Sequence, residues 1–379
     1  MRSLCITLTS PFVLNAFLLG HISRLSQSFR VVVCVNRLES DVPISLPAGV
    51  ELRHVEIRRN ISLYHDLAAL VRLFRLYRRE KFAVVFSVTP KGGLLAMLAA
   101  RLAATPVRVH CFTGQVWANM TGASRVLFKV IDHLLARCAT DLLADSPSQC
   151  KYLVEEGIVE QSKIGVLGEG SISGVNLERF RPDPNARNAV RVELGISGGT
   201  FCLLYVGRMK KDKGVPDLLE AFGRLRIQYP QLHLIMVGPD EEHLLAGYNE
   251  DGFHHIGYTQ KVETYMAAAD IICLPSYREG FGTVLIEAAA SGLPAVASRI
   301  YGITDAVVEG ETGLMHRVGD IVEITDCVDR LLREPSLRRK IGEAAAQRAK
   351  ALFAAEHLEI LLAEWLSAKI KISNQPDTA

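Results

Sequence analysis

The sequence lacks the features that mark membrane-spanning, secreted and metal-bound chains. Its 379 residues contain no run of about 18 uninterrupted apolar residues, so we expect no transmembrane helix. Polar residues between Thr7 and Pro11, and again at Asn15, interrupt the first apolar stretch, and no Ala-x-Ala-like cleavage site follows, which argues against a signal peptide. The eight cysteines are scattered without a Cys-x-x-Cys pair. We therefore expect a reduced, cytoplasmic protein without a structural metal.

Aromatic residues are few, at 7%, but apolar residues make up 49% of the chain, which is enough for a sizeable core. The length suggests two domains. The net charge is only +2 and is uneven: residues 1–185 carry 22 Lys and Arg against 15 Asp and Glu, and the remainder carries 21 against 26. A basic first half indicates an anionic partner there or simply a solvated surface, and both interpretations stay open. We expect no nucleic-acid partner.

Short, nearly continuous apolar runs alternate with longer helical patterns along the whole chain. This alternation predicts right-handed βαβ units whose parallel strands are covered on both faces. In the first half we expect strands at Leu4–Leu8, Arg30–Val35, Ala83–Val88, Val107–Phe112, Asp141–Ala144 and Lys163–Leu167, and helices at Ile61–Arg79, Gly93–Ala103, Ser124–Cys138 and Pro147–Glu156. In the second half we expect strands at Phe201–Val206, Leu232–Val237, Ile271–Leu274 and Ala295–Ala297, and helices at Val215–Gln228, Lys261–Ala269, Thr283–Ser291, Ile321–Arg333, Ser336–Ala351 and Ala355–Ile370.

A polar segment separates the two halves. Arg181–Asn188 carries two prolines and Gly195–Gly199 adds flexibility, so we place the interdomain connection here. We expect one domain over residues 1–182 and a second over 183–354, with a last helix over 355–371 that packs back on the first. The predicted fold class is α/β, with two Rossmann-like, doubly wound parallel-sheet domains facing across a cleft. In such sheets, ligands bind beyond the carboxyl ends of the strands.

The loop after the expected strand Phe201–Val206 is basic and bracketed by glycines. It reads Gly-Arg-Met-Lys-Lys-Asp-Lys-Gly from Gly207 to Gly214. Arg208 can hold phosphate oxygens as a planar fork, and Lys213 adds a point charge. We interpret the loop as a diphosphate site, although taken alone it fits a solvent-facing basic turn equally well.

Residues 275–292 place two carboxylates around a glycine-rich turn. Glu279 follows the expected strand Ile271–Leu274, and the glycines expose backbone N–H groups where a helix opens at Thr283, which favours an anion. Glu279 can reach a sugar hydroxyl or stabilise positive charge developing at an anomeric carbon. Glu287, one turn into the helix, can accept both hydroxyls of a ribose, or it merely pairs on the helix. The donor-binding candidates are Gly207, Gly280, Phe281, Gly282, Thr283 and Glu287.

Together, Gly-Arg-x4-Lys-Gly and Glu-x7-Glu resemble the signature of the family 4 retaining glycosyltransferases, which have the GT-B fold. The resemblance extends through Val237-Gly238-Pro239 and Ser291–Pro294 and covers nearly the whole second domain. It implies that Arg208 and Lys213 bind the donor diphosphate, that Glu287 binds the ribose, and that Glu279 with the neighbouring amides contacts the donor sugar. The resemblance also implies a reaction without a metal or other cofactor, and the chain contains no Asp-x-Asp motif. The catalytic candidates are Glu279, Arg208 and Lys213.

The first domain matches this family more weakly. Where many members have a glycine pair after the first strand, this chain has Thr9-Ser10-Pro11. Where many have a histidine, it has Thr113, with His110 three residues earlier, which resembles a bacterial subgroup that builds capsule, O-antigen or other lipid-linked surface glycans. Lys91 stands in a Gly-rich turn that can hold an acceptor phosphate. The acceptor-side candidates are Thr9, Lys91, His110 and Thr113; core packing of His110 and a plain turn at Lys91 are the alternatives.

The segment Arg58–Lys81 combines seven basic residues with apolar residues at helical spacing. A basic amphipathic helix can lie on an anionic membrane surface, although an ordinary surface helix has the same pattern. Our hypothesis is that this helix brings the enzyme to a polyprenyl-diphosphate acceptor at the inner face of the cytoplasmic membrane.

These observations predict a metal-independent hexosyl- or N-acetylhexosaminyltransferase. It would move a sugar with retention from a nucleotide-sugar donor, by default a UDP-sugar, to a glycan or lipid-linked glycan acceptor. A nucleotide-sugar epimerase of the same fold and a non-catalytic partner of another transferase are the alternatives. A nicotinamide-dependent oxidoreductase would need Gly-x-Gly-x-x-Gly after the first strand, and Leu4–Leu14 contains no glycine.

Overall fold

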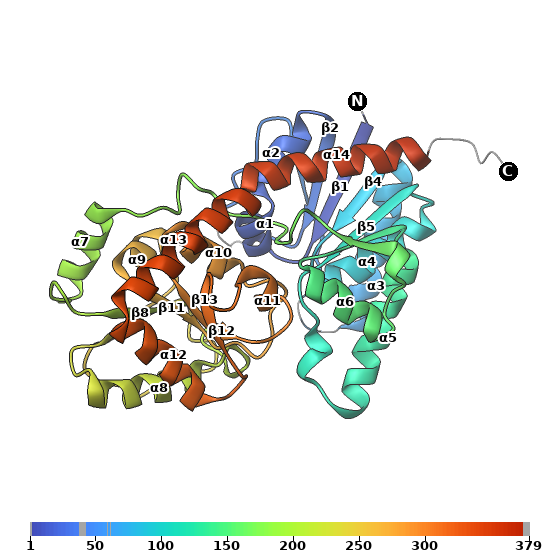
Figure 1. The fold of residues 1–379 in the computed structure, drawn as a ribbon. Helices are drawn as coiled ribbons and strands as arrows, with labels where there is room; N and C mark the ends of the chain where they lie inside the picture. The colour runs from blue at the N-terminus through green and yellow to red at the C-terminus, as the bar shows by residue number, and fades with distance from the viewer. Residues whose placement is uncertain (1, 38–42, 59, 61, 374–379) are drawn as a thin grey trace. The chain divides into compact units, whose positions relative to one another are not determined.

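The computed structural model describes residues 2–37, 43–58, 60 and 62–373. Contacts between residues divide the chain into two compact units, one formed by Met1–Ser173 with Ala355–Ala379 and the other by Gly174–Ala354. Each unit is a parallel β-sheet covered by helices, and Figure 1 shows both. None of the helices formed by the described residues combines the length and the apolar character needed to span a bilayer.

The first unit contains a seven-stranded sheet in the order β3-β2-β1-β4-β5-β6-β7. Inner strand β1 pairs in parallel with β2 and β4, so that Cys5 lies opposite Val32 and Val85. The strands are β1 (Arg2–Leu8), β2 (Phe29–Val35), β3 (Glu51–His54), β4 (Val84–Ser87), β5 (Val107–Phe112), β6 (Asp141–Ala144) and β7 (Ile164–Val166). The helices are α1 (Pro11–Phe17), α2 (Leu19–Ser26), α3 (Leu63–Glu80), α4 (Pro90–Leu102), α5 (Gly122–Cys138), α6 (Pro147–Glu155) and α14 (Ala355–Ser373), with short 3₁₀ turns η1 (Val116–Asn119) and η2 (Gln161–Lys163).

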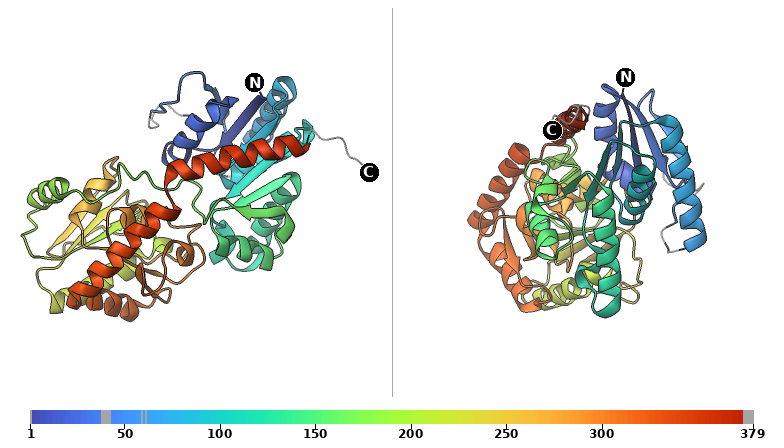
Figure 2. Two further views of the ribbon diagram at one scale, coloured as in Figure 1. Left: turned by 45° about the horizontal axis from the view of Figure 1, so that its top comes forward. Right: turned by 90° about the vertical axis from the view of Figure 1, so that its right-hand side faces the viewer.

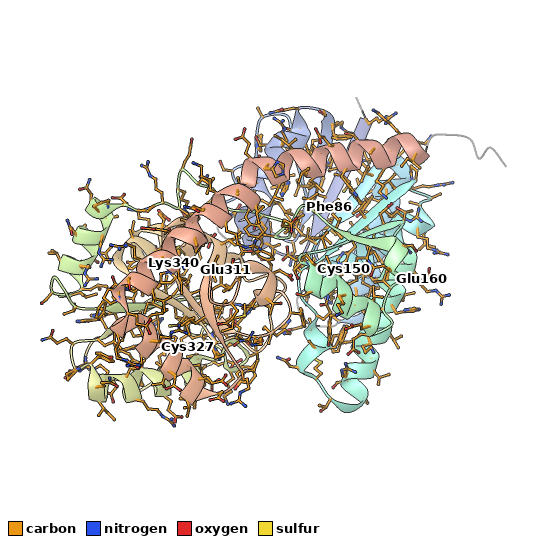
Figure 3. All side chains as sticks on the ribbon, viewed as in Figure 1. Phe86, Cys150, Glu160, Glu311, Cys327 and Lys340 are labelled. Carbon is orange, nitrogen blue, oxygen red and sulfur yellow. The ribbon has the colours of Figure 1, made fainter. Side chains whose placement is uncertain are left out.

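Two hydrophobic cores cover the two faces of this sheet. Helices α3, α4, α5 and α6 share one core, and α1, α2 and α14 share the other. Cys150 of α6 belongs to the first core and Phe86 of β4 to the second, whereas Glu160 is exposed (Figure 3). Helix α14 packs against α2 and β5, and it lies along the amino-terminal part of this unit in Figure 1 and in both views of Figure 2.

The second unit contains a six-stranded parallel sheet in the order β10-β9-β8-β11-β12-β13. Its strands are β8 (Cys202–Val206), β9 (His233–Val237), β10 (Phe253–Ile256), β11 (Ile271–Leu274), β12 (Ala295–Ser298) and β13 (Gly313–His316). Its helices are α7 (Pro184–Glu193), α8 (Val215–Gln228), α9 (Val262–Ala268), α10 (Thr283–Ala290), α11 (Ile303–Ala306), α12 (Ile321–Arg333) and α13 (Pro335–Leu352), with the 3₁₀ turn η3 (Lys211–Lys213). The central strands are buried in one continuous core, so the predicted α/β class with two doubly wound sheets is confirmed.

The segment expected to be a flexible connection is different in the structure. Arg181–Asn188 runs into helix α7, because Asp183 caps its start by accepting hydrogen bonds from the Asn185 and Ala186 amides at 3.0 Å each. Pro184 occupies the first helical turn, where its missing N–H does no harm. The chain passes between units earlier, since residues 174–182 belong with the second unit, where Val175 and Phe180 are buried in its core.

Candidate functional site

The loop after β8 lies at the carboxyl edge of the second sheet, held by its neighbours. The Gly207 amide donates to the Val237 carbonyl at 2.9 Å, and the Met209 amide donates to the Pro239 carbonyl at 2.8 Å. The loop ends in η3 and in Gly214, which has the left-handed φ of +69°. A Cβ at Gly214 would overlap the carbonyl oxygen of Pro275, so only glycine lets this loop approach the loop after β11.

That approach brings Lys213 to Glu279. The Lys213 Nζ atom lies 2.7 Å from Glu279 Oε1, and the two side chains are only 16% and 17% exposed. Ser276 Oγ donates to the same carboxylate oxygen at 2.9 Å. Desolvation opposes a largely buried ion pair of this kind, and the short contact with the Ser276 hydrogen bond offsets that cost. The pair presents a cation and a carboxylate side by side in the same loop cluster.

Arg208 pairs with a carboxylate from the loop after β9. Its guanidinium lies 3.4 Å from Glu241, and both side chains are partly exposed, so the pair contributes little stability. Tyr205 nevertheless connects Arg208 to the rest of the cluster, since its hydroxyl donates to the Arg208 carbonyl at 2.9 Å. Burial and the charges of Glu279 and Asp212 raise the pKa of Tyr205, and Arg208 opposes that rise. The charges of Arg208 and Glu279 therefore both act on the Tyr205 hydroxyl.

The turn from Glu279 to Gly282 leads into α10. Gly282 has a φ of +81° and stands at the N-cap of α10 without a side-chain hydrogen bond to the first-turn amides. An N-terminus without such a cap favours an anion. The side chain of Phe281 points elsewhere: it is buried against Phe353, with ring centroids 5.2 Å apart, so Phe281 anchors the turn in the core.

The loop after β12 contributes a residue that the sequence motifs do not reveal. Gly302 has a φ of +82°, and a Cβ there would lie 2.5 Å from the Gly280 carbonyl oxygen and 3.1 Å from that of Glu279, so it would displace both. The backbone of this loop is therefore packed directly against the Glu279–Gly280 turn. The signal available in the sequence was its place after the expected strand Ala295–Ala297, at the same sheet edge.

Glu287 lies one turn into α10 and is half-buried. Burial raises the pKa of its carboxyl to about 7; the positive charge of Arg179 opposes this shift and the negative charge of Glu263 adds to it. Arg179 is itself held by Glu263, with an Nε–Oε2 distance of 2.8 Å. Among the described residues, no group donates a hydrogen bond to the Glu287 carboxylate, so this acidic group is open to a donor from a ligand.

In the first unit, only some of the predicted acceptor-side residues lie close to one another. The Thr9 amide donates to Thr89 Oγ1 at 3.1 Å, which brings the loops after β1 and β4 together. Lys91 pairs with Asp66 at 2.6 Å and donates to the Asn60 carbonyl, so its ammonium is already engaged.

His110 is a core residue. It is 1% exposed, its Nδ1 lies 2.8 Å from Ser87 Oγ, and burial lowers its pKa to about 3. A neutral, enclosed imidazole packed this way supports the core alternative rather than contact with an acceptor. Thr113 directly follows β5 and is half-buried, so it stays at the sheet edge.

Comparisons with known proteins agree with this geometry. Residues 186–348 match the family model of the glycosyl transferases group 1, and residues 21–170 match that of the glycosyl transferase 4-like domain. The capsular polysaccharide biosynthesis glycosyltransferase CapM of Staphylococcus aureus is 30% identical over 314 residues, which span 81% of this chain and 82% of CapM. The chain belongs to the group 1 glycosyl transferases. The family resemblance seen in the sequence is thereby confirmed.

Two further proteins extend the comparison. A UDP-Gal:alpha-D-GlcNAc-diphosphoundecaprenol alpha-1,3-galactosyltransferase of Escherichia coli is 28% identical to this glycosyltransferase over 72% of each chain. The crystal structure of HepE from Anabaena, in complex with UDP and glucose, superimposes with a TM-score of 0.79 at 18% identity, over 97% of this chain and all of HepE. This structural likeness shows that the glycosyltransferase has the GT-B fold.

Proposed function

We propose that this glycosyltransferase moves a sugar, with retention, from a UDP-sugar to a lipid-linked glycan in the synthesis of a capsule or related surface polysaccharide. The relatives support the capsule, the lipid-linked acceptor and the UDP-sugar donor. CapM is named for capsular polysaccharide biosynthesis, the E. coli relative for a diphosphoundecaprenol acceptor, and HepE was crystallised with UDP and glucose. We propose a hexose or N-acetylhexosamine as the sugar and a reaction that needs no metal.

The donor would lie along the carboxyl edge of the second sheet. The observation that carries this proposal is the Lys213–Glu279 pair, 2.7 Å apart and next to the uncapped start of α10. Lys213 and Arg208 would hold the diphosphate together with the Thr283 end of α10, which replaces the charge that a metal supplies in other enzymes. Glu287 would accept the ribose hydroxyls.

Binding would change the partners of both charged groups. A diphosphate carries more negative charge than a carboxylate, so Lys213 would turn to it and leave Glu279 free to accept a sugar hydroxyl. Glu279 would also stabilise positive charge as the anomeric carbon loses its bond to the diphosphate. We propose that the acceptor hydroxyl attacks on the face that the diphosphate leaves, which retains the configuration. The bond from the anomeric carbon to the diphosphate breaks, the bond to the acceptor oxygen forms, and the hydroxyl proton passes to a phosphate oxygen of the departing diphosphate. Departure of the leaving group is aided by Lys213, Arg208 and the amides of α10.

Substitution of the pair tests this proposal. Lys213→Ala and Glu279→Ala should each lower transfer of radiolabelled sugar to a lipid extract by about 10²-fold or more, because each removes charge stabilisation of the transition state. Lys211→Ala and Glu311→Ala are matched controls, since both side chains are exposed and Glu311 lies in a separate turn (Figure 3). Wild-type rates in either site variant would contradict the mechanism.

A lipid-linked acceptor requires the enzyme to reach the membrane. We propose peripheral contact with the inner face of the cytoplasmic membrane through the Arg58–Lys81 segment, of which Arg59 and Ile61 lie outside the described residues. Its exposed arginines support this role.

A further inference from the structure

Helices α3 and α5 each carry an apolar stripe that no described part of the first unit covers. The exposed fractions run from 37% at Val71 to 85% at Leu63 on α3, and from 43% at Leu134 to 61% at Val126 on α5. The two stripes have the same spacing, i, i+1, i+4 and i+8, which places each on one side of its helix. The stripe residues are Leu63, Tyr64, Leu67 and Val71 on α3, and Val126, Leu127, Val130 and Leu134 on α5.

These stripes are separate from the faces that build the fold. On α3 the core is reached by Ala69, Leu73 and Tyr77, and on α5 by Leu135, Ala136 and Cys138. Each helix is therefore apolar on two sides, one buried in the domain and one open to solvent. A surface helix needs only the first of these, and a cluster of large exposed apolar side chains marks an interaction site.

The topology places both stripes near the acceptor side of the first unit. Helices α3 and α5 flank α4 and share one core with it. Because each follows a parallel strand, each begins near the carboxyl edge of the sheet. Leu63 is the first residue of α3 and Val126 the fifth residue of α5, so both lie near the start of their helices, as Lys91 does in α4. The apolar surface therefore starts at the sheet edge that carries Thr9 and Thr113.

The charges on these helices favour an anionic lipid surface over a second copy of the chain. Helix α3 carries four arginines in its second half, and its acidic residues Asp66 and Glu80 are both in ion pairs. Asp132, the single acidic residue in the α5 sequence, is buried and hydrogen-bonded to Trp117 at 2.7 Å. Self-association through this face would bring the positive charges of two copies together, whereas acidic lipid head groups would pair with those positive charges.

We propose that α3 and α5 dock the first unit on an anionic leaflet, with their apolar stripes entering the boundary between head groups and acyl chains. This inference rests on the proposed lipid-linked acceptor and names α5 as a second contact with the membrane. Docking at this face sets the carboxyl edge of the first sheet at the bilayer surface, where the diphosphate of a lipid-linked acceptor lies. The exposed Arg75 and Arg78 of α3 and Arg137 of α5 hold the acidic head groups, whereas Arg125 and Lys129 of α5 pair with Glu156.

Vesicle flotation with the full chain tests the proposal. The wild-type protein should float with vesicles of phosphatidylcholine and phosphatidylglycerol, less with phosphatidylcholine alone, and less at high salt. Substituting Val126, Leu127 and Val130 together by Ser should weaken flotation at least tenfold, and so should the same change at Leu63, Tyr64 and Leu67. The matched control replaces two exposed apolar residues of the second unit, Val192 and Ile227, by Ser and should float like the wild type.

Two further measurements separate the possible failures. Thermal unfolding and UDP binding of the stripe variants should match the wild type, which shows that they fold and keep the donor site. Transfer to a water-soluble acceptor analogue should also be unchanged, whereas transfer to a lipid-linked acceptor in vesicles should fall. Failure of the wild type with both acceptors would overturn the proposed function alone. Unchanged flotation of both stripe variants, or a dimer in light scattering that the α5 change dissolves, would overturn the docking proposal.

Discussion

Replacing Glu287 by Gln should change both the pH dependence of donor binding and the stability of the second unit. The pKa of this carboxyl is raised to about 7 in the folded protein, from an ordinary value of 4.5. Two ribose hydroxyls donating to the carboxylate would stabilise the ionised form and lower that pKa again. Binding then releases a proton below pH 7, so the affinity for UDP should weaken about tenfold from pH 8 to pH 6.

The raised pKa of Glu287 has the opposite effect on folding: the folded state becomes less stable as the pH rises. A carboxyl whose folded pKa lies above its unfolded pKa contributes stability that is fully present below pH 4.5 and is lost as the pH rises through about 7. Above pH 7 the ionised carboxylate therefore opposes folding, by up to about 3 kcal/mol. Glu287→Gln removes that charge, so the variant should unfold at a higher temperature than the wild type at pH 8 and bind UDP weakly at every pH.

Calorimetric titration of UDP between pH 6 and pH 8.5, with thermal unfolding at the same values, measures both effects. Arg179→Met is a useful companion, because loss of its positive charge should raise the pKa of Glu287 further and move the weakening of UDP binding to higher pH. Glu311→Gln, at an exposed turn, is the control for loss of a carboxylate. Equal pH profiles for wild type and Glu287→Gln would refute the assignment of this carboxylate to the ribose.

Two other substitutions test the packing beneath the site. Gly302→Ala should raise the KM for the UDP-sugar several-fold while leaving UDP binding nearly intact, because a Cβ there would displace the Glu279–Gly280 backbone next to the sugar. Steady-state kinetics measures the KM and a calorimetric titration measures UDP binding. An unchanged KM would contradict the contact. Phe281→Ala should lower the free energy of unfolding by about 3–5 kcal/mol, since it empties a core position against Phe353, and a chemical denaturation midpoint close to that of the wild type would count against this role.

The sequence was most informative where one kind of interaction decides the structure. Strands β5, β6 and β11 have the predicted bounds because buried parallel strands are mainly apolar runs between turns, interrupted in β5 only by Arg108 and His110. Helices α8 and α12 also match, since their apolar residues recur at helical spacing. Strands β3, β10 and β13 were missed because they are four-residue edge strands without a continuous apolar run. Strands β3 and β10 are also only partly buried. Helix α7 was missed because its proline was interpreted as a break rather than as a helix start.

In the candidate site, too, the contacts that strand positions decide were predictable and those that distant residues decide were not. The pairing of Lys213 with Glu279 was predictable because both follow neighbouring strands, β8 and β11, at the same sheet edge. The partners of Arg208 and Lys91 were not, because each depends on a side chain far away in the sequence, Glu241 and Asp66. The link between Arg179 and Glu263 spans 84 residues and leaves no spacing pattern. Tertiary packing, rather than local sequence, decides such contacts.

The return of α14 to the first unit has a consequence for the order in which the chain matures. Four of its side chains, Leu358, Leu362, Leu366 and Ile370, fill one core of a sheet whose strands are all synthesised before residue 167. The second unit has its complete sequence once Ala354 leaves the ribosome, whereas the first has its amino-terminal strands early and must wait for its last helix. The domain that is translated first is therefore the one that is finished last, and the part of its apolar sheet face that α1 and α2 leave open stays uncovered until α14 has been synthesised.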